Sequence, residues 1–141
     1  MTGSVSNGVR NALDGTVNIY GGTIISESSD AIANVSTGYI EIAGGTITGG
    51  TGKAGISLQN GSMKITGGSI TGQSFGIWIN SSNSPTLTFG TSDSTINSVP
   101  LITATNPTGN GVYVGTGSTF NFYDGTIIGG YSNGTGYSIT S

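Results

Sequence analysis

The chain has 141 residues, a length typical of one structural domain. Only 6% of its residues are charged, against about 25% in an ordinary globular domain, and the net charge is −3. This charge is too small to attract nucleic acid or an anionic membrane. The absence of cysteine and histidine excludes a disulfide framework, thiolate metal sites and imidazole catalysis. We therefore expect no nucleic-acid partner, no metal site and no cofactor.

No apolar run approaches the roughly 18 residues needed to span a membrane, so we expect no membrane insertion. Residues 1–10 also lack the charged-then-apolar pattern of a signal peptide. If the protein is exported, we expect its signal to lie outside this sequence, which is then part of a longer chain.

A short glycine-rich motif recurs along the chain. It reads Gly-Gly-Thr-Ile at 21–24, Gly-Gly-Thr-Ile at 44–47 and Gly-Gly-Ser-Ile at 67–70, and we assign two degenerate copies to 94–96 and 125–127. The isoleucine spacing is 47 − 24 = 23 and 70 − 47 = 23, followed by 96 − 70 = 26 and 127 − 96 = 31. Such a repeat indicates a solenoid.

Two further strands accompany each motif. An alternating apolar segment precedes it at 17–19, 40–42, 63–65, 87–89 and 120–122, which is typical of half-buried strands. A third strand follows it, centred on Ile32, Ile56, Ile77, Val112 and Tyr137. We predict one all-β domain over 1–141, a right-handed parallel β-helix of about five coils of roughly 23 residues with three short strands per coil. We place inserted loops near 80–85 and 97–110, which contain all three prolines.

This pattern resembles the right-handed β-helix repeats of the pectin-lyase-like superfamily, and the motif is similar to the GG-x-I element of bacterial surface and adhesin repeats. The resemblance covers nearly the whole chain. It implies an adhesive or structural protein of the cell surface, or an enzyme that acts on polysaccharides, because this fold carries many activities.

Two aspartates are the best candidates for catalysis. Asp93 and Asp124 each lie three positions before a predicted core isoleucine, which places them in the same corner of adjacent coils. Two carboxylates about 5 Å apart are typical of a retaining glycosidase. However, aspartate is also common in turns because it hydrogen-bonds to nearby backbone, and we favour that interpretation.

Two aromatic residues are the candidates for carbohydrate binding. Trp78 and Tyr113 occupy the same outward column of the third strand on neighbouring coils, together with Arg10, Ala33, Ser57 and Ser138. Exposed aromatic rings form a platform on which a sugar ring stacks. The alternative is that the inserted loops fold over both rings and bury them.

A third candidate surface is the outward face of the second strand. Its hydroxyl side chains form an array similar to that of β-solenoid ice-binding proteins, namely Thr46, Thr48, Ser69, Thr71 and Thr95. Two of the five coils break the array, with Ile25 and Ile128, and threonine is also a good exposed strand former, so we favour a structural role.

The leading functional hypothesis is therefore a secreted or cell-surface repeat domain with an adhesive or structural role and no catalysis. Its partner is a glycan or a cell-surface receptor. The alternatives are a carbohydrate-binding module, a polysaccharide lyase or glycoside hydrolase, and an ice-binding protein. End-to-end self-association is a further possibility, because the terminal coils carry no visible cap.

Overall fold

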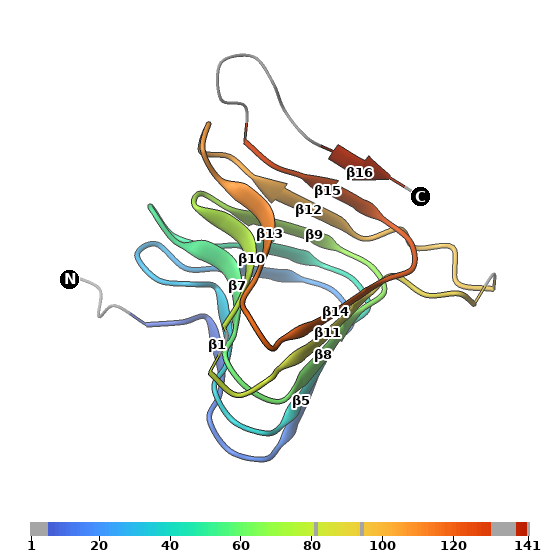
Figure 1. The fold of residues 1–141 in the computed structure, drawn as a ribbon, viewed down its shortest axis with the longest axis horizontal. Helices are drawn as coiled ribbons and strands as arrows, with labels where there is room; N and C mark the ends of the chain where they lie inside the picture. Colours follow the sequence, from blue (N-terminus) through green and yellow to red (C-terminus); the bar gives the residue numbers. More distant parts are fainter. Residues whose placement is uncertain (1–5, 81, 94, 131–137, 141) are drawn as a thin grey trace.

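The computed structural model describes residues 6–80, 82–93, 95–130 and 138–140, which form three β-sheets around one core (Figure 1). Sheet A contains β1 (Val9–Asn11), β4 (Ile32–Asn34), β7 (Ala54–Leu58), β10 (Phe75–Ile79) and β13 (Asn110–Val114). Sheet B contains β2 (Thr16–Ile19), β5 (Tyr39–Ile42), β8 (Ser62–Ile65), β11 (Thr86–Phe89) and β14 (Thr119–Phe122). Sheet C contains β3 (Thr23–Ile25), β6 (Thr46–Thr48), β9 (Ser69–Gly72), β12 (Leu101–Ala104), β15 (Thr126–Ile128) and β16 (Ser138–Thr140).

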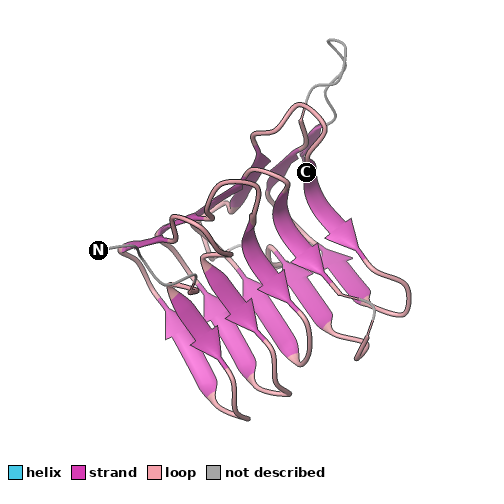
Figure 2. Ribbon diagram, turned by 90° about the vertical axis from the view of Figure 1, so that its left-hand side faces the viewer, coloured by secondary structure: helices cyan, strands magenta, loops and turns pink. Residues whose placement is uncertain are grey.

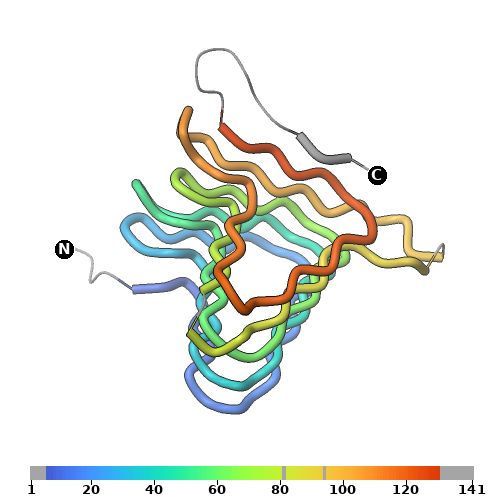
Figure 3. Tube along the Cα trace, in the orientation of Figure 1, coloured from blue at the N-terminus to red at the C-terminus, as the bar shows by residue number. Residues whose placement is uncertain are grey.

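The chain passes through sheets A, B and C in that order, and each circuit lies on the previous one. Strands of successive circuits pair in parallel, as the arrows lying side by side in Figure 2 show. The successive turns overlap in a roughly triangular outline (Figure 3). The prediction of an all-β parallel β-helix with about five coils and three strands per coil is confirmed. The described residues include no helix long and apolar enough to cross a membrane.

Aliphatic columns form the core. Since strand side chains alternate between the two faces, each sheet buries every second residue, and the parallel register stacks these residues from coil to coil. In sheet C, for example, Ile47 pairs with Ile70 and Ile70 with Ile102, and all three are completely buried.

Sheet A departs from simple alternation where it meets sheet C. Here a small residue and the aliphatic residue after it both face the core, in the pairs Gly8-Val9, Ala31-Ile32, Gly55-Ile56, Gly76-Ile77 and Gly111-Val112. The small residue is required because a Cβ at Gly76 would lie 2.2 Å from Cγ2 of Ile102, and one at Gly55 would lie 2.7 Å from Cγ2 of Ile70. This double inward step leaves the residue before each pair on the outer face.

Glycine also makes the tight corners between sheets B and C. Gly22, Gly45, Gly68 and Gly125 have φ values of 87°, 102°, 94° and 122°, which side-chain-bearing residues rarely adopt. In the fourth coil the register places Pro100 at this position, because Leu101 pairs with Ser69. The proline ring restricts φ to negative values, so the same tight corner is impossible there. β11 and β12 are joined instead by a longer loop, described at 90–93 and 95–100 and referred to as the loop of 90–100, which projects from the triangular outline in Figure 3.

The sequence predicts the fourth strand of sheet C at 94–96; Ser94 lies outside the described residues, and for Thr95 and Ile96 the prediction is wrong. Ile96 lies in this loop and is 39% exposed, whereas Ile102 of β12 pairs with Ile70 and is completely buried. The predicted loop at 97–110 is wrong in the same region, because residues 101–104 are a strand. The isoleucine spacing is actually 102 − 70 = 32 and 127 − 102 = 25. Residues 80–85 connect β10 to β11.

The end of the chain also differs from the prediction. Tyr137 lies outside the described residues, and β16 does not extend sheet A. Instead it pairs antiparallel with β15 in sheet C, with Ser138 opposite Ile128. Ser138 is therefore not part of the outward column that contains Trp78 and Tyr113.

Candidate functional site

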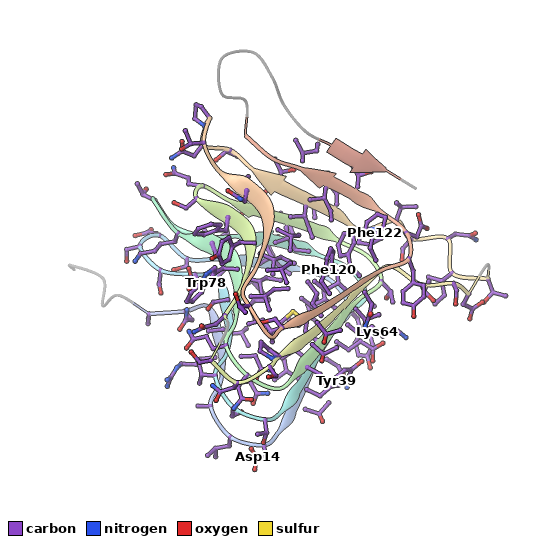
Figure 4. All side chains as sticks on the ribbon, viewed as in Figure 1. Asp14, Tyr39, Lys64, Trp78, Phe120 and Phe122 are labelled. Atoms are coloured by element: carbon purple, nitrogen blue, oxygen red, sulfur yellow. The ribbon has the colours of Figure 1, made fainter. Side chains whose placement is uncertain are left out.

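The outer face of sheet A carries a cluster of three aromatic side chains from β10 and β13. Trp78 pairs with Tyr113 across the two strands, as the repeat predicts. Phe75 joins them because the inward step at Gly76-Ile77 turns it to the outside. We refer to Phe75, Trp78 and Tyr113 as the aromatic cluster. Figure 4 shows Trp78 on the outer side of sheet A, away from the core.

The rings are packed together but remain accessible. The centroids of Phe75 and Tyr113 are 5.6 Å apart with an angle of 57° between the ring planes, a tilted arrangement that aromatic pairs favour. Tyr113 is 44% exposed, while Phe75 and Trp78 are partly buried. The alternative that loops bury both Trp78 and Tyr113 therefore does not hold for Tyr113.

The outward column that contains Trp78 continues with small residues. In the column that continues from Tyr113 through Trp78, the next two residues are Ser57 and Ala33, and both are buried. A groove of about 260 Å³ lies beside Phe75 and Trp78. It is lined by Asp30, Gly52, Lys53, Ala54, Phe75 and Trp78.

The corners between sheets C and A hold the margin of this groove in place. The Ala54 amide donates to Oδ1 of Asp30 at 2.9 Å, which ties one corner to the next. The Gly52 amide donates to Oε1 of Gln73 at 2.8 Å, and the Ser74 hydroxyl donates to the Gly52 carbonyl at 3.0 Å. Hydrogen bonds between coils therefore support the margin, and the groove is preformed.

This arrangement offers aromatic faces with two charged groups beside them. Asp30 accepts and Lys53 donates hydrogen bonds, which suits a ligand with apolar ring faces and hydroxyl edges. Sequence reasoning identified Trp78 and Tyr113 but missed Phe75, Asp30 and Lys53. A small residue precedes the core aliphatic residue of sheet A in every coil, here Gly76 before Ile77. This repeated pair could have indicated that Phe75, the residue before it, faces outward. Nothing in the spacing indicated the two charged residues.

The two candidate catalytic aspartates do not share a corner position. Asp124 lies two residues after the end of β14, and it is next to Gly90 of the previous coil, since a Cβ at Gly90 would lie 2.2 Å from the Asp124 carbonyl oxygen. Asp93 lies further along the loop of 90–100, whose insertion removes it from that position. The prediction that both aspartates occupy the same corner is therefore wrong.

Both aspartates instead stabilise turns. Oδ1 of Asp93 accepts hydrogen bonds from the Thr95 amide at 2.9 Å and from the Thr95 hydroxyl at 2.7 Å. The side-chain bond and then the backbone bond lower the pKa of Asp93 below its ordinary value, and the charge of Lys64 lowers it slightly further. Oδ1 of Asp124 accepts a hydrogen bond from the amide of Gly125 at 2.7 Å, and Gly125 is itself the positive-φ glycine of this corner.

The outer face of sheet C carries a hydroxyl array that differs from the predicted one. Thr46, Thr48, Ser69 and Thr71 lie on β6 and β9 as expected, with Thr46 beside Ser69 and Thr48 beside Thr71. Thr95 lies in the loop instead, and Thr103 of β12 takes the position beside Thr71. The corrected column reads Ile25, Thr48, Thr71, Thr103 and Ile128.

The outer face of sheet B carries Tyr39 and Lys64, shown in Figure 4. Burial, and to a lesser degree the negative charge of Glu41, raises the pKa of Tyr39. A small pocket of about 210 Å³ lies between this face and the loop of 90–100, with Lys64 and Tyr123 in its lining. Across the part of the chain that the structure describes, no three acidic side chains gather closely enough to hold a metal ion.

Comparison of this chain with protein-family models, with curated proteins and with solved structures finds no match. The candidate function therefore depends on the geometry of the sheet faces described above.

Proposed function

We propose that this chain is a non-catalytic carbohydrate-binding module with an adhesive role, and that the aromatic cluster on sheet A is its binding surface. The observation that carries the proposal is the convergence of Phe75, Trp78 and Tyr113 beside a preformed groove. The C–H faces of a sugar ring pack on aromatic rings, while its hydroxyls take hydrogen bonds at the ring edge.

The scale of the groove favours a short stretch of polysaccharide. A volume of about 260 Å³ accommodates about one sugar ring, and the ladder of coils extends the same face along the solenoid axis. A groove that contacts about one sugar ring supports only weak binding. Such weak sites act in adhesion when several copies engage one polymer.

We favour binding over cleavage because the groove holds one carboxylate rather than an opposed pair. Asp30 lines the groove, and its Oδ1 already accepts the Ala54 amide. Asp93 and Asp124 are turn residues on other parts of the chain. The resemblance to pectin-lyase-like repeats and to GG-x-I surface repeats supports an extracellular or cell-surface location and a glycan or cell-surface receptor as partner.

The only tryptophan of the chain lies in the proposed site, and this gives a direct assay. We expect polysaccharides that bind, selected on a glycan array, to change the fluorescence of Trp78 in a saturable titration. Calorimetry with Trp78→Ala and Tyr113→Ala should show binding weakened by at least about tenfold. Tyr123→Ala, which removes another exposed tyrosine outside the groove, is the matched control and should bind normally. Binding that survives both groove substitutions, or a complete lack of binding across the array, would count against the proposal.

A second candidate, ice binding, is favoured by one specific observation. β12 places Thr103 in the fourth coil, so that Thr48, Thr71 and Thr103 form a continuous hydroxyl column on a parallel sheet. If this face binds ice, the chain should inhibit ice recrystallisation, and Thr71→Tyr should abolish the effect. The same substitution at Thr95, which lies off the sheet, should have no effect.

A further inference from the structure

Three asparagine–glycine pairs lie within the described residues, at 7–8, 60–61 and 110–111, and a fourth at 133–134 lies outside them. Such a pair can react within the chain, because the glycine amide nitrogen can attack the side-chain carbonyl carbon of the asparagine. Glycine has no side chain that hinders this approach. The reaction is fast where the fold holds the two groups next to each other, so the geometry of each pair decides its reactivity.

Asn60 and Gly61 form the corner between β7 and β8, and here the two groups are in contact. Oδ1 of Asn60 accepts a hydrogen bond from the Gly61 amide at 2.7 Å, and the structure gives that amide no other partner among the described residues. Because Oδ1 is bonded to Cγ, the Gly61 nitrogen lies beside the carbon that it attacks. Both residues are half-buried rather than enclosed, so water has access to the pair.

Hydrogen bonds between coils hold this corner in place. The Asn60 amide donates to the Asn34 carbonyl of the previous coil at 3.3 Å. The Gly61 carbonyl accepts from the Thr86 amide of the next coil at 3.1 Å. The main chain on both sides of the reacting groups is therefore fixed, and no further ordering is needed to bring these groups together.

The other two described pairs lack this arrangement. Nδ2 of Asn7 donates to Oγ of Ser29 at 3.3 Å and to the Asp30 carbonyl at 2.8 Å, which ties this side chain to the next coil. Asn110 and Gly111 belong to β13, and a strand directs its side chains out of the sheet while its amides lie within the sheet. Asn60 is thus the described asparagine that is best placed to react with a following glycine.

The corner of Asp124 has a similar geometry but a different chemistry. Oδ1 of Asp124 accepts a hydrogen bond from the Gly125 amide at 2.7 Å. A carboxylate is a poor electrophile, however, because attack on it has to expel an oxide or hydroxide. The side-chain amide of Asn60 instead releases ammonia, so the reaction is favoured at Asn60.

We propose that Asn60 is a site of spontaneous covalent modification, at which the folded chain deamidates through a succinimide. The Gly61 nitrogen gives its proton to water and forms a bond with Cγ of Asn60. The bond from Cγ to Nδ2 then breaks, and the amide group takes a proton from water and leaves as ammonia. Water next opens the five-membered ring: addition at Cγ gives aspartate, and addition at the main-chain carbonyl of residue 60 gives isoaspartate.

Both products alter the corner between β7 and β8. Each adds one negative charge to a chain whose net charge is −3. Isoaspartate also leads the main chain through Cβ and Cγ, which lengthens a corner that joins strands of fixed register. The modification therefore acts on the scaffold, and it does not depend on the proposed glycan groove.

Tryptic digestion gives a direct assay, because the chain has only three basic residues and cleavage after them separates two of the pairs. Asn7 is the only asparagine of the peptide 1–10, and Asn60 is the only asparagine of the peptide 54–64. The full chain is incubated at mildly alkaline pH, either folded or unfolded in urea. It is then digested under mildly acidic conditions, and mass spectrometry with chromatographic separation of isoaspartate quantifies each peptide.

In urea the two asparagines should deamidate at similar rates, since both precede glycine. In the folded chain Asn60 should be converted at least about tenfold faster than Asn7, and isoaspartate should be among its products. Gln59, in the same peptide as Asn60, is the matched control and should keep its amide, because its cyclisation requires a six-membered ring. If Asn60 reacts no faster than Asn7 in the folded chain, or yields aspartate without isoaspartate, the proposal is overturned.

Discussion

The assignment of β12 leads to a quantitative prediction about stability. Two isoleucines of the fourth coil, Ile96 and Ile102, both fit the repeat pattern, but only Ile102 lies in the core. Ile102 is completely buried in the sheet C column, whereas Ile96 lies in the loop of 90–100 and is 39% exposed. Substitution of Ile102 by alanine removes three carbons from a packed core. At about 0.8 kcal/mol per buried methylene the transfer loss is about 2.4 kcal/mol, and the cavity raises the total to about 3–4 kcal/mol.

The same substitution at Ile96 should cost less than about 1 kcal/mol, since its side chain contributes little to the core. Urea unfolding followed by far-UV circular dichroism and by Trp78 fluorescence measures both values. The two probes also show whether the coils unfold together, because repeat proteins lose cooperativity more readily than globular domains. If Ile96→Ala destabilises the chain as much as Ile102→Ala, the pairing of Ile102 with Ile70 in β12 is incorrect.

Four further predictions concern individual contacts. Gly76→Ala should destabilise the chain by about 1–3 kcal/mol in urea unfolding, because its Cβ would lie 2.2 Å from an isoleucine methyl of sheet C. Asn34→Leu should lower stability by about 1 kcal/mol, because it removes the buried hydrogen bond from Nδ2 to the Gly38 carbonyl, while it also removes the unsatisfied Oδ1 and matches Leu58 in the same column of the next coil. Asn34→Asp should be strongly destabilised at neutral pH and recover on acidification, because burial raises the folded-state pKa of an unpaired carboxyl above its unfolded value. Finally, Thr95→Ala should raise the pKa of Asp93 in an NMR titration, because it removes the hydroxyl hydrogen bond that contributes most to lowering that pKa, while the Thr95 amide bond remains. The stability that these bonds contribute to the loop is present above the unfolded-state pKa of Asp93 and is lost as the pH falls through its lowered folded-state value.

Much of the architecture could be predicted from local spacing. In coils one to three the constant repeat interval and the period-two alternation are sufficient to place the strands, because a constant corner length keeps the inward side chains in register. The same register placed Trp78 beside Tyr113. These features depend on short-range geometry, which the sequence pattern records directly.

The fourth coil could not be predicted in this way, because two segments have similar local patterns. Ser94-Thr95-Ile96 resembles the repeat more closely than Leu101-Ile102-Thr103 does, since a proline precedes the second segment. Only packing distinguishes them: Ile102 continues the column between Ile70 and Ile127, and the loop of 90–100 absorbs the extra residues.

The groove likewise depends on tertiary structure. Asp30 and Lys53 lie on separate corners, one repeat apart in the chain, and they flank Trp78 only because the coils stack. Phe75 faces outward because Gly76 and Ile77 both turn inward against sheet C. The sequence pattern therefore predicts which residues share a column, whereas the corners that bring separate columns together are decided by packing between sheets.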